Sequence, residues 1–225
     1  MSRTRRTRAA ATGLALATVP LVLAACGSAA SPPASAAQTS LSPTPAPLTS
    51  VPLTSGAMAT PSGLPGLATA PTVVLTRFAK YGPDAQAVTY DPARVPVDAD
   101  VAAVLVQTTG QTMTLLAVRG LAPNQHFGAH VHTGACGAKP ADAGSHFQHQ
   151  PDPKQPSVDP AYANPRNEIW LDFSTDKSGS AHVESAVAWT FGDRPHGSIV
   201  IHAEPTSSEP GHAGTAGGRL ACVDI

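Results

Sequence analysis

Short segments in which apolar and polar side chains alternate recur over the C-terminal part of the chain. Side chains two residues apart on a β-strand point to the same face, so this alternation predicts strands with one buried face. Glycines lie between or beside these segments, and no segment carries an apolar stripe of helical period. The predicted strands are Ala87–Asp91, Val101–Gln107, Met113–Arg119, His126–His132, Glu168–Thr175, Ser180–Ala188, Ser198–Ala203 and Arg219–Val223.

These segments predict an all-β domain of about eight short strands, built as an antiparallel sandwich or flattened barrel with long loops. One connection is unusual: residues 133–167 are rich in Pro, Asp, Asn and Gly and show no regular pattern. An irregular loop of that length inside a compact domain is usually functional. This loop contains His146 and His149, so it is a candidate part of a site.

The N-terminus has the composition of an export signal. Four arginines in the first eight residues precede an apolar run over residues 9–25, which is too short and too weakly apolar for a membrane span. The run ends in LAACG at residues 23–27, which resembles the lipobox of bacterial lipoproteins. We therefore predict a lipoprotein signal peptide over residues 1–26, with lipidated Cys26 anchoring the exported protein to the extracytoplasmic face of the cell membrane. An ordinary signal peptide is the alternative.

Residues 27–76 form a separate segment because they contain no charged side chain and are dense in Pro, Ser, Thr and Ala. Such a composition buries too little apolar area to offset the loss of chain entropy on folding. The sequence therefore predicts a disordered tether over residues 27–76 and a single folded domain over residues 77–225.

The charge balance argues against a nucleic-acid partner. Without the four leader arginines, the 14 Lys and Arg fall to 10 against 15 Asp and Glu. The exported protein is therefore mildly acidic, and it has no basic run or aromatic series that would bind a nucleic acid.

Two cysteines, Cys136 and Cys222, remain once Cys26 is assigned to the lipid. Disulfides form and persist outside the cytoplasm. A Cys136–Cys222 disulfide is therefore the simplest interpretation, and a pair of free thiols is the alternative.

Four histidines are candidate metal ligands. His130 and His132 lie two residues apart in GAHVHTG, so on a strand their imidazoles point to the same face. His146 lies in GSHF of the long loop, and His202 ends the stretch GSIVIH, near the end of the predicted strand Ser198–Ala203. Four imidazoles without a thiolate form an all-nitrogen site that suits Cu(II). Histidines that only fill space in the fold are the alternative.

Five stretches together resemble the copper/zinc superoxide dismutase family in its exported bacterial form. They occur in the family's order and span most of the chain from residue 87 to residue 222. They are GLAPNQHFGAHVH through the paired histidines, GSHF, DFSTDKSG, SIVIHAE and AGTAGGRLAC.

The resemblance implies an eight-stranded Greek-key sandwich and a copper site. It implies copper ligation by His130, His132, His146 and His202, and a disulfide between Cys136 and Cys222. It also implies that Arg219 lies beside the open side of the copper and attracts the superoxide anion, and that His146 takes part in catalysis. The implied function is copper-dependent dismutation of superoxide to oxygen and hydrogen peroxide at the cell envelope. A copper-sequestering lipoprotein on the same fold is the alternative.

The zinc half of the family's site is not matched. In the family the loop histidine bridges copper and zinc, and two further histidines and an aspartate complete the zinc site. After His146 this chain offers only His149 at an unfamiliar spacing, with Glu168 or Asp152 as acidic candidates. Because structural zinc takes four close ligands, we predict a copper-only protein. Glu168 is then expected to orient the far nitrogen of His146.

The loop at 203–218 also departs from the family, since Thr206 stands near the position of a family aspartate. Asp172 and Asp176 are interpreted as strand-end and turn residues. The remaining histidines are expected to have surface or packing roles, and they are His126, His182, His196 and His212.

Overall fold

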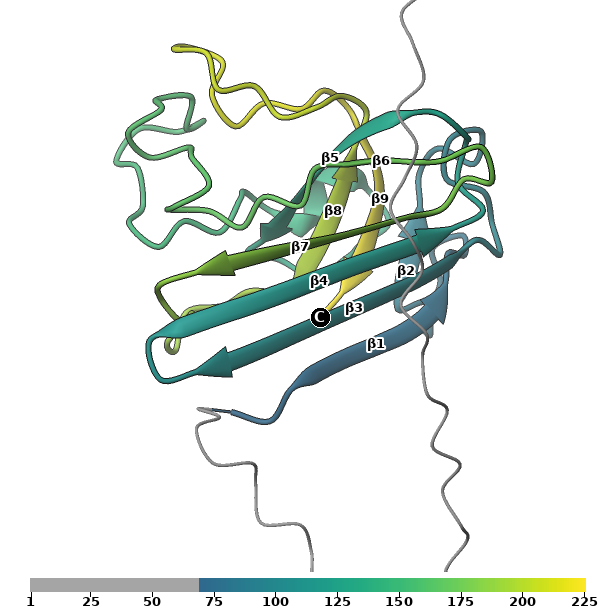
Figure 1. Cartoon of the computed structure of the whole chain (residues 1–225), viewed down its shortest axis with the longest axis horizontal. Coiled ribbons are helices and arrows are strands. Elements are labelled where there is room, and N and C mark those ends of the chain that lie inside the picture. Colours follow the sequence, from purple (N-terminus) through teal and green to yellow (C-terminus); the bar gives the residue numbers. More distant parts are fainter. Residues whose placement is uncertain (1–68) are drawn as a thin grey trace, which may run out of the picture. The chain divides into compact units, whose positions relative to one another are not determined.

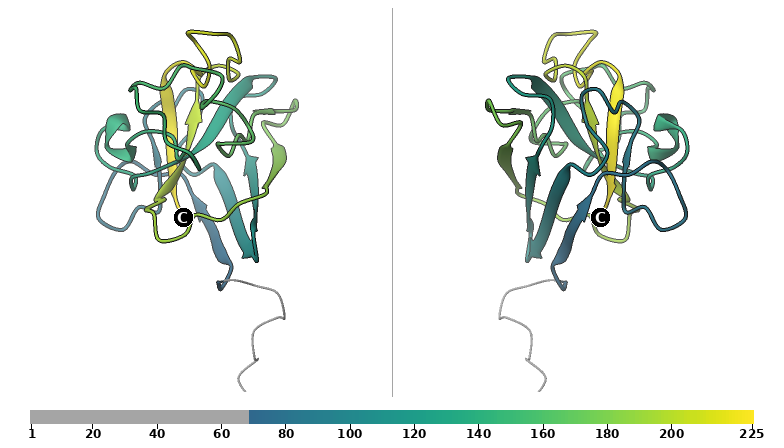
Figure 2. Two further views of the ribbon diagram at one scale, coloured as in Figure 1. Left: turned by 90° about the vertical axis from the view of Figure 1, so that its left-hand side faces the viewer. Right: turned by 90° about the vertical axis from the view of Figure 1, so that its right-hand side faces the viewer.

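The computed structural model describes residues 69–225, which form two antiparallel sheets packed face to face (Figures 1 and 2). The strand order is β1-β3-β4-β7 in one sheet and β2-β9-β8-β5-β6 in the other. The predicted all-β sandwich is confirmed, and the sheets do not close into a barrel. No helix among the described residues is long and apolar enough to span a membrane. The elements are β1 (Thr72–Arg77), β2 (Ala87–Thr89), β3 (Asp100–Thr108), β4 (Gln111–Arg119), β5 (His126–His132), the 3-10 helix η1 (Pro140–Ala143), β6 (Phe173–Ser174), β7 (Ala181–Val187), β8 (Ser198–His202) and β9 (Arg219–Asp224).

The core lies between the two sheets, because alternate residues of each strand point into the space between the layers. On the four-stranded sheet these residues come mainly from β3 and β4, and on the five-stranded sheet from β5, β8 and β9. They include the buried side chains Val101, Ala103, Leu105, Leu116, Val118, Phe127, Ala129, Val131, Ile199, Ile201, Ala221 and Val223.

The predicted strand Glu168–Thr175 is mostly irregular. Only Phe173 and Ser174 pair as a strand, with β5. The preceding residues still follow β5, since Leu171 N donates to Ala129 O at 2.7 Å and Trp170 forms an isolated bridge with His130. The segment therefore covers the edge of the five-stranded sheet without forming a continuous ladder.

Strand β1 lies within residues that the sequence analysis assigned to the tether. It pairs with β3 along its whole length, so the folded region begins before Arg77. The strand was not predicted because it is uncharged at its start, like the tether, and buries only Val74, while Val73 and Leu75 are 57% and 74% exposed. Residues 1–68, which include the leader with Cys26 and most of the predicted tether, lie outside the described residues.

The long loop 133–167 covers the outer face of the five-stranded sheet. A disulfide between Cys136 and Cys222 ties this loop to β9, as predicted. Val200 and Cys222 pack against Ala143 of η1 in a small second core. Both faces of β8 are therefore buried, one under the other sheet and one under the loop.

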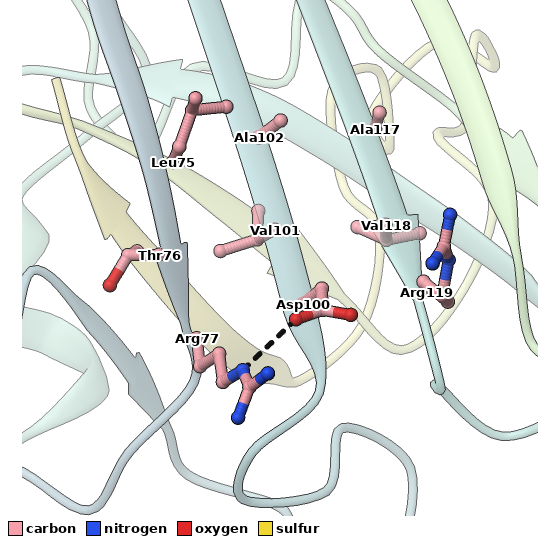
Figure 3. Close-up of a pocket in the computed structure, with 9 residues that line it drawn as sticks. All are labelled: Leu75, Thr76, Arg77, Asp100, Val101, Ala102, Ala117, Val118 and Arg119. Atoms are coloured by element: carbon pink, nitrogen blue, oxygen red, sulfur yellow. Dashed lines mark hydrogen bonds and ion pairs between the residues drawn. The ribbon is translucent and has the colours of Figure 1, made fainter.

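The outer face of the four-stranded sheet has a shallow pocket of about 440 Å³ over β1, β3 and β4 (Figure 3). Arg77 Nε donates to Asp100 Oδ1 at 3.1 Å across the β1–β3 pair, with both side chains more than half exposed. An ion pair so exposed contributes little to stability. No histidine or cysteine lines this pocket, so the candidate chemistry lies elsewhere.

We predict that the double substitution Cys136→Ser and Cys222→Ser lowers the free energy of unfolding. The disulfide joins residues 86 positions apart, and closing a loop of that length is worth up to about 4–5 kcal/mol in the chain-entropy treatment. Denaturant unfolding of the variant beside the oxidised and the reduced wild-type protein measures the effect. A loss below about 1 kcal/mol would contradict this account of the loop.

Candidate metal centre

Three of the four predicted ligands lie on one face of the five-stranded sheet. In the antiparallel pairing of β5 with β8, Gly128 lies opposite His202, and His130 lies opposite Val200. Residues that are directly opposite share a face. His130, His132 and His202 therefore project from the outer side of the sheet, toward the loops and away from the sandwich core.

The fourth ligand, His146, comes from the long loop, which runs beside β5 at this point. Phe147 N donates to Val131 O at 2.8 Å and Thr133 N donates to Ser145 O at 3.0 Å, so His146 forms an isolated bridge with His132. Phe147 is buried against Trp189 and Phe191. Backbone pairing and an aromatic anchor thus place the loop histidine beside the strand histidine.

The four imidazoles converge on a single point. Each offers one nitrogen, and these nitrogens all lie within 4.8 Å of one another. Nε2 of His202 and Nε2 of His132 are only 3.4 Å apart. His130 and His132 are fully buried, and His202 is 4% exposed. The His146 side chain is 18% exposed, so the centre is open to solvent on that side.

The outward nitrogen of each imidazole has a hydrogen-bond partner that determines where the ring proton lies. His132 Nδ1 donates to Gly144 O at 3.1 Å, and His202 Nδ1 lies 3.5 Å from Gly217 O. A carbonyl oxygen only accepts, so in both rings the proton sits on Nδ1. His146 Nδ1 donates to the Glu168 carboxylate at 2.9 Å. In these three rings Nε2 therefore carries a lone pair.

The His130 ring is turned the other way, with Nε2 outward and Nδ1 inward, but its outward nitrogen also has a hydrogen-bond partner. Its outward nitrogen is Nε2, which lies 2.7 Å from Thr206 Oγ1. Its inward nitrogen, Nδ1, is buried and has no hydrogen-bond partner. A buried polar atom without a partner is costly, and here it faces three other nitrogens.

Four converging lone pairs with an unpartnered buried nitrogen fit a bound metal ion. An ion with metal–nitrogen bonds of about 2.0–2.1 Å keeps its ligand atoms within about 4.2 Å of one another, close to the spread seen here. The cluster is one of two groups among the described residues with metal-ligand spacing. The other group combines Asp224 with the two disulfide-bonded cysteines, which are not free to bind a metal.

The same environment keeps the rings neutral. Burial lowers the pKa of His202 to about 3, and the charge of His146 adds to this effect. Burial, followed by the charge of His146, also lowers the pKa of His130 and His132 well below their usual value. Neutral imidazole is the form that binds a metal, so the fold holds these ligands ready at neutral pH.

Arg219 lies beside this centre because of an irregularity in β9. The register between β8 and β9 shifts after Ile201, so that His202 pairs with Arg219. Such a bulge redirects a side chain. The guanidinium donates to Pro140 O at 2.9 Å and to Gly144 O at 2.7 Å. Together with His146 and His202 it lines a pocket of about 390 Å³. Partial burial lowers the pKa of Arg219, but a guanidinium stays charged in proteins.

The doubtful zinc ligands do not come together. The His149 ring stacks on Trp189 at 5.1 Å and 8°, outside the histidine cluster. Asp152 accepts hydrogen bonds from Ser157 Oγ and Lys154 N within its own loop. No second cluster of ligands forms around His146 within residues 69–225.

Glu168 lies behind His146, and its carboxylate is fully engaged. It is 1% exposed. Its Oε2 accepts from His146 Nδ1 at 2.9 Å and from Trp170 Nε1 at 2.7 Å, and its Oε1 accepts from Gln148 Nε2 at 2.8 Å. The geometry predicted for Glu168, a carboxylate on the far nitrogen of His146, is present.

The sequence analysis missed several contacts around the centre. Trp170 is half-buried and donates to Glu168. Thr206 contacts His130, and Asp172, which lies at the end of strand β6 as interpreted, also accepts from Thr206. Asp176 does form a turn, with Ser178. Besides His149, the histidines outside the cluster are the four expected to lie there, His126, His182, His196 and His212.

A buried all-nitrogen centre on a β-sandwich defines a metal-binding protein of a kind that suits copper. The family model described as copper/zinc superoxide dismutase (SODC) matches residues 101–225, more than half of the chain. The chain belongs to the copper/zinc superoxide dismutase family, so the predicted family is confirmed.

The solved structures to which the chain is similar include Cu/Zn superoxide dismutase from Brucella abortus, at 19% identity and a TM-score of 0.47. That similarity covers 69% of this chain and 99% of the other. A double mutant of a SOD-like protein from Bacillus subtilis is similar at 14% identity and a TM-score of 0.41, over 55% of this chain and 88% of its own. No curated protein matches the chain.

We predict that the metal-free protein loses stability as the pH falls below about 6.5. Burial lowers the pKa of His202 in the folded protein to about 3, from its ordinary value of 6.5. On acidification the unfolded chain therefore binds the proton first. The stability is fully present above pH 6.5 and declines toward pH 3, by up to about 1.4 kcal/mol per pH unit for this ring.

Urea unfolding of the metal-free protein between pH 7 and pH 4 measures this slope. His202→Gln is expected to flatten it, because glutamine does not titrate. His212→Gln removes an exposed histidine outside the cluster and is the matched control. An unchanged slope in His202→Gln would contradict the assignment.

Proposed function

We propose that this protein is a copper-dependent superoxide dismutase, exported and anchored to the extracytoplasmic face of the cell membrane through lipid on Cys26. The observation that carries this proposal is a cluster of four converging imidazole nitrogens, two of whose rings, His146 and His202, line one solvent-accessible pocket together with the Arg219 guanidinium. The reaction converts two superoxide anions and two protons into oxygen and hydrogen peroxide.

The donor set supports copper as the metal. Imidazole nitrogens suit both zinc and copper, and a tetragonal arrangement of nitrogens suits Cu(II). Bound copper would supply a one-electron couple that accepts an electron from one superoxide and returns it to the next. The chain's contribution is to hold the four rings in place, through one hydrogen bond on the outer nitrogen of each.

Arg219 is proposed to draw the anion into the pocket and orient it. Two of its five N–H donors bind the carbonyls of Pro140 and Gly144, which fixes the guanidinium beside His146 and His202. A fixed cation in a partly enclosed site raises the local concentration of an anionic substrate. Glu168, the acidic side chain of this pocket, is buried and bound to His146, so the accessible charge is positive.

His146 is proposed to supply a proton. It is the only ring of the four that is not fully or almost fully buried. Its Nδ1–H is bound to Glu168, which leaves Nε2 as the atom that can take up a proton from solvent when it is not bound to a metal. A proton held there lies next to the space where peroxide must be formed.

The proposed enzyme works without zinc. In the family, the loop histidine bridges copper and zinc, which requires both of its nitrogens. Here His146 Nδ1 is bound to Glu168, and His149 stacks on Trp189. Glu168 thus takes the position behind the histidine and holds the ring in place of a second metal.

We predict that His132→Ala abolishes superoxide removal by the copper-loaded protein. Arg219→Ala should lower the rate about tenfold or more with copper still bound, because electrostatic focusing of a substrate raises the rate by at least that factor. Arg219→Lys keeps the positive charge but not the planar set of N–H donors, so its rate should fall less than that of Arg219→Ala. Superoxide decay followed directly, with the copper content measured for each variant, is the test.

Arg119→Ala makes the same charge change on the exposed end of β4, in the other sheet, and is the matched control. Its rate should stay within about twofold of wild type, since an exposed charge beyond a Debye length is largely screened. Copper-loaded wild-type protein that leaves superoxide decay unchanged would reject the enzyme in favour of a copper-sequestering protein.

We also predict that the protein takes up one copper per chain and no tightly bound zinc. Elemental analysis after exposure to both metals and extensive dialysis measures the two contents. Glu168→Gln removes the carboxylate behind His146 and should reduce copper affinity by about 10-fold to 100-fold. One zinc per chain that survives dialysis would refute the copper-only assignment.

A further inference from the structure

A chain of two hydrogen bonds lies behind His130 and involves two residues without an expected role at the centre. Nε2 of His130 lies 2.7 Å from Thr206 Oγ1, and this hydroxyl donates to Asp172 Oδ1 at 2.6 Å. Thr206 belongs to the loop between β8 and β9, and Asp172 precedes β6. The contact therefore joins two segments of the chain behind one metal ligand.

Asp172 determines the direction of both hydrogen bonds. Its carboxylate accepts from Thr206 N at 2.7 Å, from Thr206 Oγ1 at 2.6 Å and, more weakly, from Ala129 N at 3.4 Å. An ionised carboxylate only accepts. The single proton of the Thr206 hydroxyl is therefore used toward Asp172, and the oxygen accepts from His130. The proton of His130 is held on Nε2, and Nδ1 is left with its lone pair toward the other three rings.

Gly128 gives Thr206 the space to reach His130. A Cβ on Gly128 would lie 2.7 Å from Glu204 O and 3.0 Å from Thr206 Oγ1. The absence of a side chain at this position lets the loop after β8 approach β5. Gly128 on β5 therefore allows the backbone of the loop after β8 to lie close enough for Thr206 to contact His130.

We propose that Thr206 and Asp172 are a positioning pair that selects the tautomer and the orientation of His130, so that Nδ1 is the metal-binding nitrogen. This inference rests on the proposed copper centre and deepens it. Asp172 is exposed and reaches the metal site only through the hydroxyl. Its negative charge strengthens the hydrogen bond from His130 and makes the ring a better donor to a divalent ion.

The first test compares Thr206→Val with Thr206→Ser in the full-length protein. Valine has the shape of threonine but cannot accept from His130, whereas serine keeps the hydroxyl. We expect the affinity for Cu²⁺, measured by competition with a chelator, to fall about 10-fold to 100-fold in Thr206→Val and to stay within about threefold of wild type in Thr206→Ser. Thr76→Val makes the same change on β1, in the other sheet, and should leave the affinity unchanged.

Asp172→Asn is the sharper test because it changes no shape and lies at an exposed position. An amide cannot accept from both the backbone N–H and the hydroxyl of Thr206 with all its atoms in place. Its NH₂ group then donates to the hydroxyl, which turns the hydroxyl proton toward His130 Nε2 and favours the wrong tautomer. We expect a loss of Cu²⁺ affinity similar to that of Thr206→Val. Asp193→Asn, at an exposed turn, is the control.

Two further readouts distinguish positioning from general destabilisation. The electron paramagnetic resonance spectrum of bound Cu(II) should change in Thr206→Val and Asp172→Asn, and the reduction potential of the copper should rise, because a weaker donor stabilises Cu(II) less. Unfolding of the metal-free variants should stay close to wild type. Affinity, spectrum and potential equal to wild type in both variants would overturn the inference.

The results separate this inference from the proposed function. Wild-type protein that binds copper tightly, with the variants weakened as described, supports the positioning pair even if superoxide decay is unchanged, an outcome that would reject only the dismutase. Active wild-type protein with unaffected variants would reject only the positioning pair. Wild-type protein that binds no copper would reject both.

Discussion

Mutual repulsion among four imidazole lone pairs in a buried space is the constraint that the surrounding structure has to satisfy. The nitrogens lie within 4.8 Å of one another, and two Nε2 atoms approach to 3.4 Å. Burial disfavours protonation of the rings, so a metal ion is the natural group to relieve this repulsion. Every ring is held from behind, by an acceptor or hydroxyl on its outer nitrogen.

Those supports come from loops, which explains why irregular segments cover this face of the sheet. Gly144 O accepts both from His132 Nδ1 and from the Arg219 guanidinium. His132 and Arg219 are thus tied to one backbone position. The disulfide between Cys136 and Cys222 holds the same loop against β9, the strand that carries Arg219. The contacts that hold this loop in place therefore also determine the positions of His132 and Arg219.

Two carboxylates behind the centre hold two of the four histidine rings in this member of the copper/zinc superoxide dismutase family. Glu168 supports His146 directly, and Asp172 supports His130 through a hydroxyl. Both act on a ring nitrogen that faces away from the other histidines. A buried carboxylate with three donors, such as Glu168, forms a rigid support, whereas the exposed Asp172 depends on the loop that carries Thr206.

The sequence by itself determined the features that depend on local periodicity and on residue type. Alternation identified most of the strands and put His130 and His132 on one face, and the ordered motifs identified the four histidines that converge, the cysteine pair and Arg219. It missed β1, whose uncharged residues bury little, and the role of Asp172. The tertiary structure alone decided which nitrogen of each ring faces inward, that His149 turns to Trp189, and that a bulge aims Arg219 at the centre. These features depend on hydrogen bonds between residues far apart in the chain, and no local pattern encodes such contacts.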